Sequence, residues 1–248
     1  MTLSTIRNNP AKQKKVKTKK QKAIAATCAV AFWLLVWHVV SLCVGSELVL
    51  VSPVKVVQTL FTVIFDPDFL KTVWYSAARI LGGFFTALTL GTVLGWVASR
   101  FWVVETLLRP ITAAIKATPV ASFIILVLLW FSGKNLSVII SMLMVFPVIY
   151  MNVLEGIRSA DEKLLEMAQV FRLSVGKKLL YIYLPAVAPF FVSACSVSLG
   201  LCWKSGIAAE VIGTPDGSIG AVFYQAKIFL QTSELLAWTV VVVAVSVA

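Results

Sequence analysis

The sequence predicts an all-α polytopic membrane protein with about six transmembrane helices and both termini in the cytoplasm. Of its 248 residues, 59% are hydrophobic and only 13% are charged, and the mean hydropathy is +0.92. A soluble domain usually carries about 45–50% apolar and about 25% charged residues. The apolar residues also form long unbroken runs, whereas a β-barrel would show short alternating segments. This composition excludes an ordinary cytosolic enzyme, a disordered protein and a disulfide scaffold.

The basic residues provide the second observation. The net charge is +11, and eight of the 22 Lys and Arg residues lie within residues 1–22. A basic segment directly before an apolar run is typical of a cytoplasmic N-terminus. We therefore expect a solvated tail that sets the topology, with specific lipid binding as the alternative. No nucleic-acid partner is expected.

The first apolar run, residues 23–44, is too long for a signal peptide, whose apolar region spans about 7–15 residues. No A-x-A-like cleavage site follows it, so we expect a first spanning helix there. Residues 54–64 form an amphipathic stretch that suits the membrane interface. Further spanning helices are expected at residues 74–98, 110–131, 136–154 and 186–208, and a sixth helix is expected to begin near Glu234.

Several boundaries carry expectations of their own. Glycines in the 74–98 helix favour close helix packing, residues 132–135 are expected to form a tight turn, and Pro185 is expected to break the chain before the next span. Only 11 residues remain from Trp238 to the end of the sequence. Because a span needs about 20, we expect the natural C-terminus to lie beyond Ala248.

The distribution of basic residues agrees with this topology. Segments assigned to the inside hold 15 Lys and Arg residues, and those assigned to the outside hold four. The remaining three, Arg79, Lys116 and Lys204, fall within predicted helices. Because inner loops of membrane proteins are enriched in Lys and Arg, both termini are expected inside.

No constellation for catalysis is present in the sequence. There is no G-x-x-x-x-G-K-[ST] phosphate loop, and no nucleophile–base or metal-ligand spacing. The four cysteines, Cys28, Cys43, Cys195 and Cys202, lie in apolar runs and are expected to pack as small hydrophobic residues. His38 is expected to be a packed residue rather than a proton relay. The chain is therefore not expected to be an enzyme or to bind a metal.

A polar segment, residues 155–183, separates two of the predicted spans. Loops longer than about 12–15 residues tend to be functional, and this one has helix-like apolar spacing. It is expected to form a short amphipathic helix pair that presents apolar and basic residues to a partner. A merely solvated connector is the alternative.

The same segment carries a recognisable signature: Glu-Ala-Ala, three residues, Gly, nine residues, then Ile-x-Leu-Pro. Five positions match, and two differ because Met167 and Arg172 replace an alanine and the glycine. The matching residues are Glu166, Ala168, Ile182, Leu184 and Pro185. With this signature the chain closely resembles the type I permeases of binding-protein-dependent ABC transporters. Because a side chain makes positive φ costly, we expect the turn at Arg172 to be remade or moved towards Gly176.

Further motifs resemble the nitrate/sulfonate/taurine/bicarbonate subgroup of these permeases. They are Ser52-Pro53, the stretch SAARILGGF at residues 76–84, LWF at 129–131, GIRS at 156–159, Trp203-Lys204 and AAEVIG at 208–213. The resemblance implies a type I ABC importer permease fold, with a basic cytoplasmic tail at residues 1–22 and a transmembrane permease domain at 23–248. Within that domain, the type I ABC transmembrane domain spans about residues 72–248 and includes the cytoplasmic ATPase-coupling loop at 155–183. The substrate implied is a small oxyanion or sulfonate. A vitamin or thiamine precursor is the alternative.

The resemblance also implies partners. Two permease subunits, this chain with a second copy or a homologue, would form the pathway in the lipid bilayer of the bacterial cytoplasmic membrane. Two separate ATPase subunits would bind ATP and Mg²⁺, none being held by this chain, and an extracytoplasmic binding protein would deliver the substrate. The ATPase would dock on residues of about 160–178, with Glu166 and Ala168 on the buried face. The coupling residues implied are Glu166, Met167, Ala168, Arg172, Gly176, Ile182, Leu184 and Pro185.

Lys204 is the one lysine expected inside the apolar part of the 186–208 helix. A charge at the centre of a membrane costs at least about 2.5–3.5 kcal/mol. Lys204 is expected either to reach the headgroups or to line the pathway and favour an anion, with Trp203, Ser205 and Glu210 shaping the entrance. Glu210 lies about 240° further around a helix, so the two side chains are not expected to pair.

Two other classes of function remain open, an ion-coupled carrier and a non-transporting membrane scaffold. A coupled carrier tends to place carboxylates inside its spanning helices. Here seven acidic residues are assigned to loops or helix ends: Glu47, Asp66, Asp68, Asp161, Glu162, Asp216 and Glu234. The ABC permease is therefore the favoured interpretation.

Overall fold

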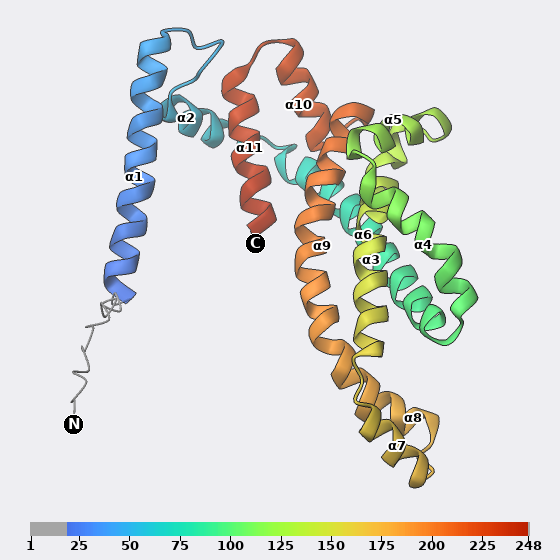
Figure 1. Cartoon of the computed structure of the whole chain (residues 1–248). Coiled ribbons are helices and arrows are strands. Elements are labelled where there is room, and N and C mark those ends of the chain that lie inside the picture. The colour runs from blue at the N-terminus through green and yellow to red at the C-terminus, as the bar shows by residue number, and fades with distance from the viewer. Residues whose placement is uncertain (1–18, 248) are drawn as a thin grey trace, which may run out of the picture. The chain divides into compact units, whose positions relative to one another are not determined.

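The computed structural model describes residues 19–247, and every regular element in that range is a helix (Figure 1). The chain divides into two units, residues 1–54 and 55–248. In the first unit, α1 spans Lys19–Val44, which confirms the first predicted helix. The Ser41 hydroxyl donates to the Leu50 carbonyl, 3.1 Å away, beyond the end of this helix. Most of the predicted basic tail lies outside the described residues.

The second unit contains the remaining helices. In chain order they are α2 (Pro53–Ile64, beginning at the boundary), α3 (Phe69–Arg100), α4 (Trp102–Ala117), α5 (Val120–Trp130), α6 (Gly133–Arg158), α7 (Glu162–Val170), α8 (Val175–Lys178), the π-helical turn η1 (Leu179–Tyr183), α9 (Leu184–Gly213), α10 (Ile219–Ile228) and α11 (Thr232–Val247). The predicted interfacial helix at 54–64 corresponds to α2.

The core of the second unit is formed where α6 packs between α3 and α9. Glycines on α3 permit the close approach. A Cβ on Gly83 would collide with the carbonyl oxygen of Val138, and one on Gly91 would lie 3.0 Å from the Ile149 side chain. Gly82, in contrast, has nothing within 4 Å. The predicted role of small residues in helix packing is therefore confirmed at Gly83 and Gly91.

By length and composition, four helices of the described chain could cross a membrane, or five if one bent pair counts as a single span. The four are α1, α3, α6 and the continuous helix from α8 to α9. The bent pair is α4 and α5, and α11 is a shorter apolar helix. The sequence predicted these apolar segments, but two of them differ in form.

The predicted single helix at residues 110–131 is wrong. Two helices, α4 and α5, replace it and meet at an angle of 110°. Thr118 between them is extended, with φ −84° and ψ 133°. Pro119 causes this break, because its ring pushes the preceding residue out of the helical region and it has no N–H to continue the hydrogen-bond ladder.

The predicted break at Pro185 is also wrong, since the helix continues from Val175 to Gly213. The ladder widens just before the proline: the Leu184 N–H donates to the carbonyl of Leu179, five residues back. Pro185 then occupies the first turn of α9, where a missing N–H is tolerated. A π-helical turn thus replaces the expected interruption.

A helix not predicted from the sequence, α10, precedes α11. Ser218 caps it, with its hydroxyl oxygen accepting from the Ala221 N–H at 3.0 Å. The turn before it contains Gly217, whose φ of +75° suits glycine. Figure 1 shows α10 and α5 near one end of α9, and α7 and α8 at its opposite end.

Candidate functional site

Two regions contain the residues singled out from the sequence. One is the α7–α8 segment, residues 162–178, which links α6 to the long helix of α8, η1 and α9. The other is the far end of α9, where Lys204 and Glu210 lie. Helix α7 begins after Asp161, whose Oδ1 accepts from the Lys163 N–H at 2.9 Å, and this is a standard N-cap.

Ala168 anchors the α7–α8 segment to its own chain. It is fully buried in a small apolar cluster with Ala160 and Ile182, against which Leu165 and Leu173 pack. Its neighbour Glu166 is exposed. Of these two residues only Ala168 is buried within this chain, because residues two apart on a helix point in different directions, and the predicted burial of both residues against the ATPase stays a prediction.

Arg172 forms the turn that ends α7. Its φ is +49°, its N–H donates to Gln169 O, and the Leu173 N–H donates to Ala168 O at 2.9 Å. This pair of bonds defines a Schellman motif, which normally carries glycine at the position of Arg172. The expected remaking of the turn is wrong: the arginine adopts the left-handed conformation, and Gly176 lies inside α8.

Several large apolar side chains of the α7–α8 segment are exposed. The relative exposures of Val170 and Val175 are 80% and 82%, and that of Phe171 is 71%. Met167 is also exposed, as are Leu184 and Pro185 further along. Contiguous apolar side chains at a surface mark an interaction site, and basic residues, Lys177 among them, accompany these.

The second region separates the residues predicted to line a pathway. Lys204 is exposed, but Trp203 and Ser205 on either side of it are buried. The indole N–H of Trp203 donates to the carbonyl of Val242 on α11 at 3.0 Å. The Ser205 hydroxyl donates to Leu201 O within α9. Of these three neighbours, Lys204 alone offers its side chain to an outside molecule.

Glu210 lies inside α9 and has no exposed surface. Its Oε2 accepts from the Ser76 hydroxyl of α3 at 2.6 Å and from the Gly220 N–H of α10 at 3.4 Å. The predicted helix ended at residue 208 and left Glu210 beyond it, but α9 continues to Gly213. Lys204 and Glu210 therefore occupy different faces of α9, one exposed and one buried, as expected for residues that do not pair.

Polar groups of two other helices surround this buried carboxylate. Arg79 on α3 acts on it electrostatically and donates from Nη2 to Asn135 Oδ1 at 2.9 Å. The guanidinium of Arg79 also lies over the ring of Tyr75, 4.9 Å from its centroid. In the sequence, the only indication of this polar cluster was that charged residues such as Arg79 and Glu210 lie within apolar runs. The sequence could not show that Ser76 meets Glu210 or that Arg79 meets Asn135.

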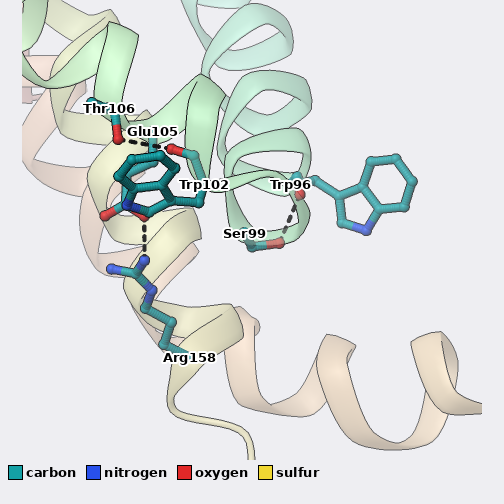
Figure 2. A network of polar contacts seen from close by, with 6 residues as sticks. All are labelled: Trp96, Ser99, Trp102, Glu105, Thr106 and Arg158. Atoms are coloured by element: carbon teal, nitrogen blue, oxygen red, sulfur yellow. Dashed lines mark hydrogen bonds and ion pairs between the residues drawn. The ribbon is translucent and has the colours of Figure 1, made fainter.

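A second polar network joins α4 to α6 near the α7–α8 segment. Arg158 donates from Nη2 to Glu105 Oε2 at 2.5 Å, and both side chains are partly exposed. Figure 2 shows Glu105 directed towards Arg158, with Trp96 pointing away from the pair. Trp96 and Arg100 border a separate cavity of about 450 Å³ that reaches Lys178.

Within residues 19–247, no group of three His, Cys, Asp or Glu side chains could hold a metal ion. Cys202 is buried and Cys195 is half-buried, whereas Cys28 and Cys43 are exposed. The expectation that all four cysteines are buried thus holds for Cys202 alone.

Comparison with known proteins identifies relatives. The family model described as "Binding-protein-dependent transport system inner membrane component" matches residues 87–248. The putative aliphatic sulfonates transport permease protein of Bacillus subtilis is 29% identical over 84% of this chain and 76% of its own length. The taurine transport system permease protein of Escherichia coli is 27% identical over 85% and 78%. A nitrate import permease protein of Synechocystis sp. is 25% identical over 82% and 76%.

Proposed function

Because the chain belongs to the family of binding-protein-dependent transport system inner membrane components, and is thus a permease subunit of an ABC importer in the bacterial inner membrane, we propose that it imports a small sulfonate or oxyanion. The relatives named above are permeases for aliphatic sulfonates, taurine and nitrate. Sulfonates, taurine and nitrate all carry a compact anionic oxygen group. A vitamin or thiamine precursor is not favoured by these relatives.

The α7–α8 segment is the proposed docking site for the ATPase. The observation that supports this is the set of exposed apolar side chains on a short helical connection, which includes Val170, Phe171 and Val175. Large exposed apolar residues of this kind are expected at a protein interface. Ala168 contributes by holding the segment against the η1 turn, since it is buried with Ile182.

The assembly that follows contains two ATPase subunits, a second permease copy or homologue, and an extracytoplasmic binding protein. ATP and Mg²⁺ bind to the ATPase, and this chain supplies transport and coupling rather than catalysis. In the proposed topology α4 and α5 count as one span and α11 as another, which gives six spans and places both termini in the cytoplasm. The basic residues around the α7–α8 segment agree with a cytoplasmic location.

Lys204 remains the proposed pathway cation. Its exposed side chain on α9 lies between two buried residues, so an anion could approach it without disturbing the core. A Lys204→Gln variant is expected to lower uptake of an anionic substrate, and Lys204→Arg to keep part of it. Wild-type uptake by Lys204→Gln would leave the lysine as a residue that only reaches the headgroups.

The function is tested by reconstituting the permease with its ATPase and binding protein in proteoliposomes. Uptake of radiolabelled taurine, an alkanesulfonate and nitrate is measured with and without internal ATP, and thiamine serves as a cargo of another class. We expect ATP-dependent uptake of one of the anions, lost when the phosphate-loop lysine of the ATPase is replaced. Uptake that survives that replacement and follows an ion gradient would instead indicate a coupled carrier.

A further inference from the structure

The amino end of α10 is attached to two other helices through a relay of hydrogen bonds. The Ser76 hydroxyl of α3 donates to Glu210 Oε2 at 2.6 Å and accepts from the Ile219 N–H at 2.9 Å. The same carboxylate oxygen accepts from the Gly220 N–H. Two backbone groups of the first turn of α10 thus find their partners on α3 and α9, because no residue of α10 can supply them.

The charges around the Glu210 carboxylate favour its role in holding the first turn of α10. Burying an unpaired charge is costly, and Glu210 has no exposed surface. The first turn of a helix carries a partial positive charge that stabilises an anion, and the positively charged Arg79 makes a smaller electrostatic contribution to the same carboxylate. Glu210 therefore depends on α10 and α3 remaining in place, just as α10 depends on Glu210.

The helices approach one another closely at this junction. A Cβ on Gly220 would collide with the backbone of Glu210, so α10 begins in direct contact with α9. A Cβ on Gly133 would collide with the Gly213 carbonyl, which brings the start of α6 against the end of α9. These contacts bring the backbones of α6 and α10 directly against α9.

We propose that Glu210 is a positioning residue for transport: together with Ser76, its carboxylate clamps the first turn of α10 to α3 and α9, so that these three helices move as one body. The clamp acts at the end of α9 opposite the α7–α8 segment (Figure 1). When α9 is displaced at the α7–α8 segment, α10 is therefore displaced together with it. The part of this proposal that concerns transport rests on the proposed function, whereas the clamp itself does not.

The clamp is tested by measuring the distance between α3 and α10 in the full chain in nanodiscs. Spin labels are placed on cysteines introduced at Lys71 and Tyr224, both exposed, after the four native cysteines have been replaced. We expect a narrow distance distribution in the parent chain, and a broadened one in Glu210→Gln and in Ser76→Ala. Ser198→Ala is the matched control, since Ser198 on α9 is equally buried and its hydroxyl has no partner among the described residues.

Transport by the reconstituted complex provides the second readout. In Glu210→Gln and Ser76→Ala we expect uptake per assembled complex to fall about tenfold while ATP hydrolysis continues, which a merely lower amount of folded protein would not produce. Because both residues act in one relay, the double variant is expected to have the same uptake rate as the single variant with the lower rate. Ser198→Ala is expected to transport normally.

Each outcome decides the proposal. Unchanged distance distributions in both variants, or losses that multiply in the double variant, would overturn the clamp. If Glu210→Gln does not assemble, the proposal is tested with Ser76→Ala. This variant keeps the carboxylate and still removes the hydrogen-bond acceptor of the Ile219 N–H. A parent complex that transports nothing would count against the proposed function, but the distance measurement would still judge the clamp.

Discussion

Three residues of the described chain other than glycine adopt positive φ: Arg172, Thr214 and Leu230. At Leu230 the bonding repeats that at Arg172, since the Gln231 N–H donates to the Ala226 carbonyl five residues back at 2.8 Å. Helix ends often require this left-handed conformation, and it costs an L-residue roughly 1–2 kcal/mol. At Arg172 this free-energy cost is offset by packing, because the turn places Leu173 against Ala168 in the small apolar cluster.

This strain leads to a prediction for Arg172. Replacement by glycine should remove the left-handed penalty and stabilise the local turn by about 1 kcal/mol, less what glycine loses in backbone entropy. Arg172→Ala is the control, because it removes the charge and keeps the strain. Hydrogen exchange of the amides of residues 168–176 in the reconstituted chain should slow in the glycine variant only. Equal exchange in both variants would show that the backbone conformation carries no measurable strain.

At the scale of the helices, adjacent glycines of α3 have opposite surroundings. Gly83 faces the backbone of α6, and Gly82 faces open space. The pattern of small residues in the sequence predicted close packing, but not which glycine makes the contact. That choice depends on how α3 is rotated against α6.

Gly83→Ala and Gly82→Ala therefore form a matched pair. The first places a methyl group against the Val138 carbonyl and should destabilise the chain by about 1–3 kcal/mol, as overpacking does. The second should be neutral or slightly stabilising, because alanine favours helices more than glycine does. Thermal unfolding of both variants in the same detergent measures the difference. Similar midpoints would contradict the packing of α3 on α6.

A separate prediction concerns the binding of the ATPase to the α7–α8 segment. Phe171→Ala and Val175→Ala should each weaken binding of the ATPase by about tenfold, or about 1.4 kcal/mol, because they remove exposed apolar contacts. Phe229→Ala is the control, since Phe229 is 70% exposed but follows α10 at the opposite end of α9. Titration of the ATPase onto the permease in nanodiscs measures the affinities. Equal affinity for all variants would exclude the segment as the docking site.

For the whole molecule, the proposed topology places the α7–α8 segment and the α10–α11 turn on opposite sides of the membrane. Single cysteines at Val175 and Phe229, in a chain without native cysteines, should report this. A maleimide that cannot cross membranes is expected to label position 229 in intact cells and position 175 only after permeabilisation. The reverse pattern would invert the topology, and labelling of both positions in intact cells would contradict it.

The sequence alone determined the membrane class, the approximate positions of the apolar helices and the segment that carries the family signature. Long apolar runs and clustered basic residues are local properties, and they decide whether a segment enters a bilayer whatever its neighbours are. The signature from Glu166 to Pro185 is likewise readable from spacing, and the family match to residues 87–248 agrees with it.

The tertiary structure decided how those helices end, bend and meet. Two prolines affect the helices differently. At Pro119 the chain bends, and α4 and α5 meet at an angle of 110°. At Pro185 the helix continues, because a π-helical turn precedes the proline. The predicted helix ended near residue 208 and left Glu210 beyond it, yet Glu210 lies inside α9, buried against Ser76, 134 residues away in the sequence. Such contacts depend on partners distant in the chain, and burial and helix rotation are set by those partners rather than by local propensity.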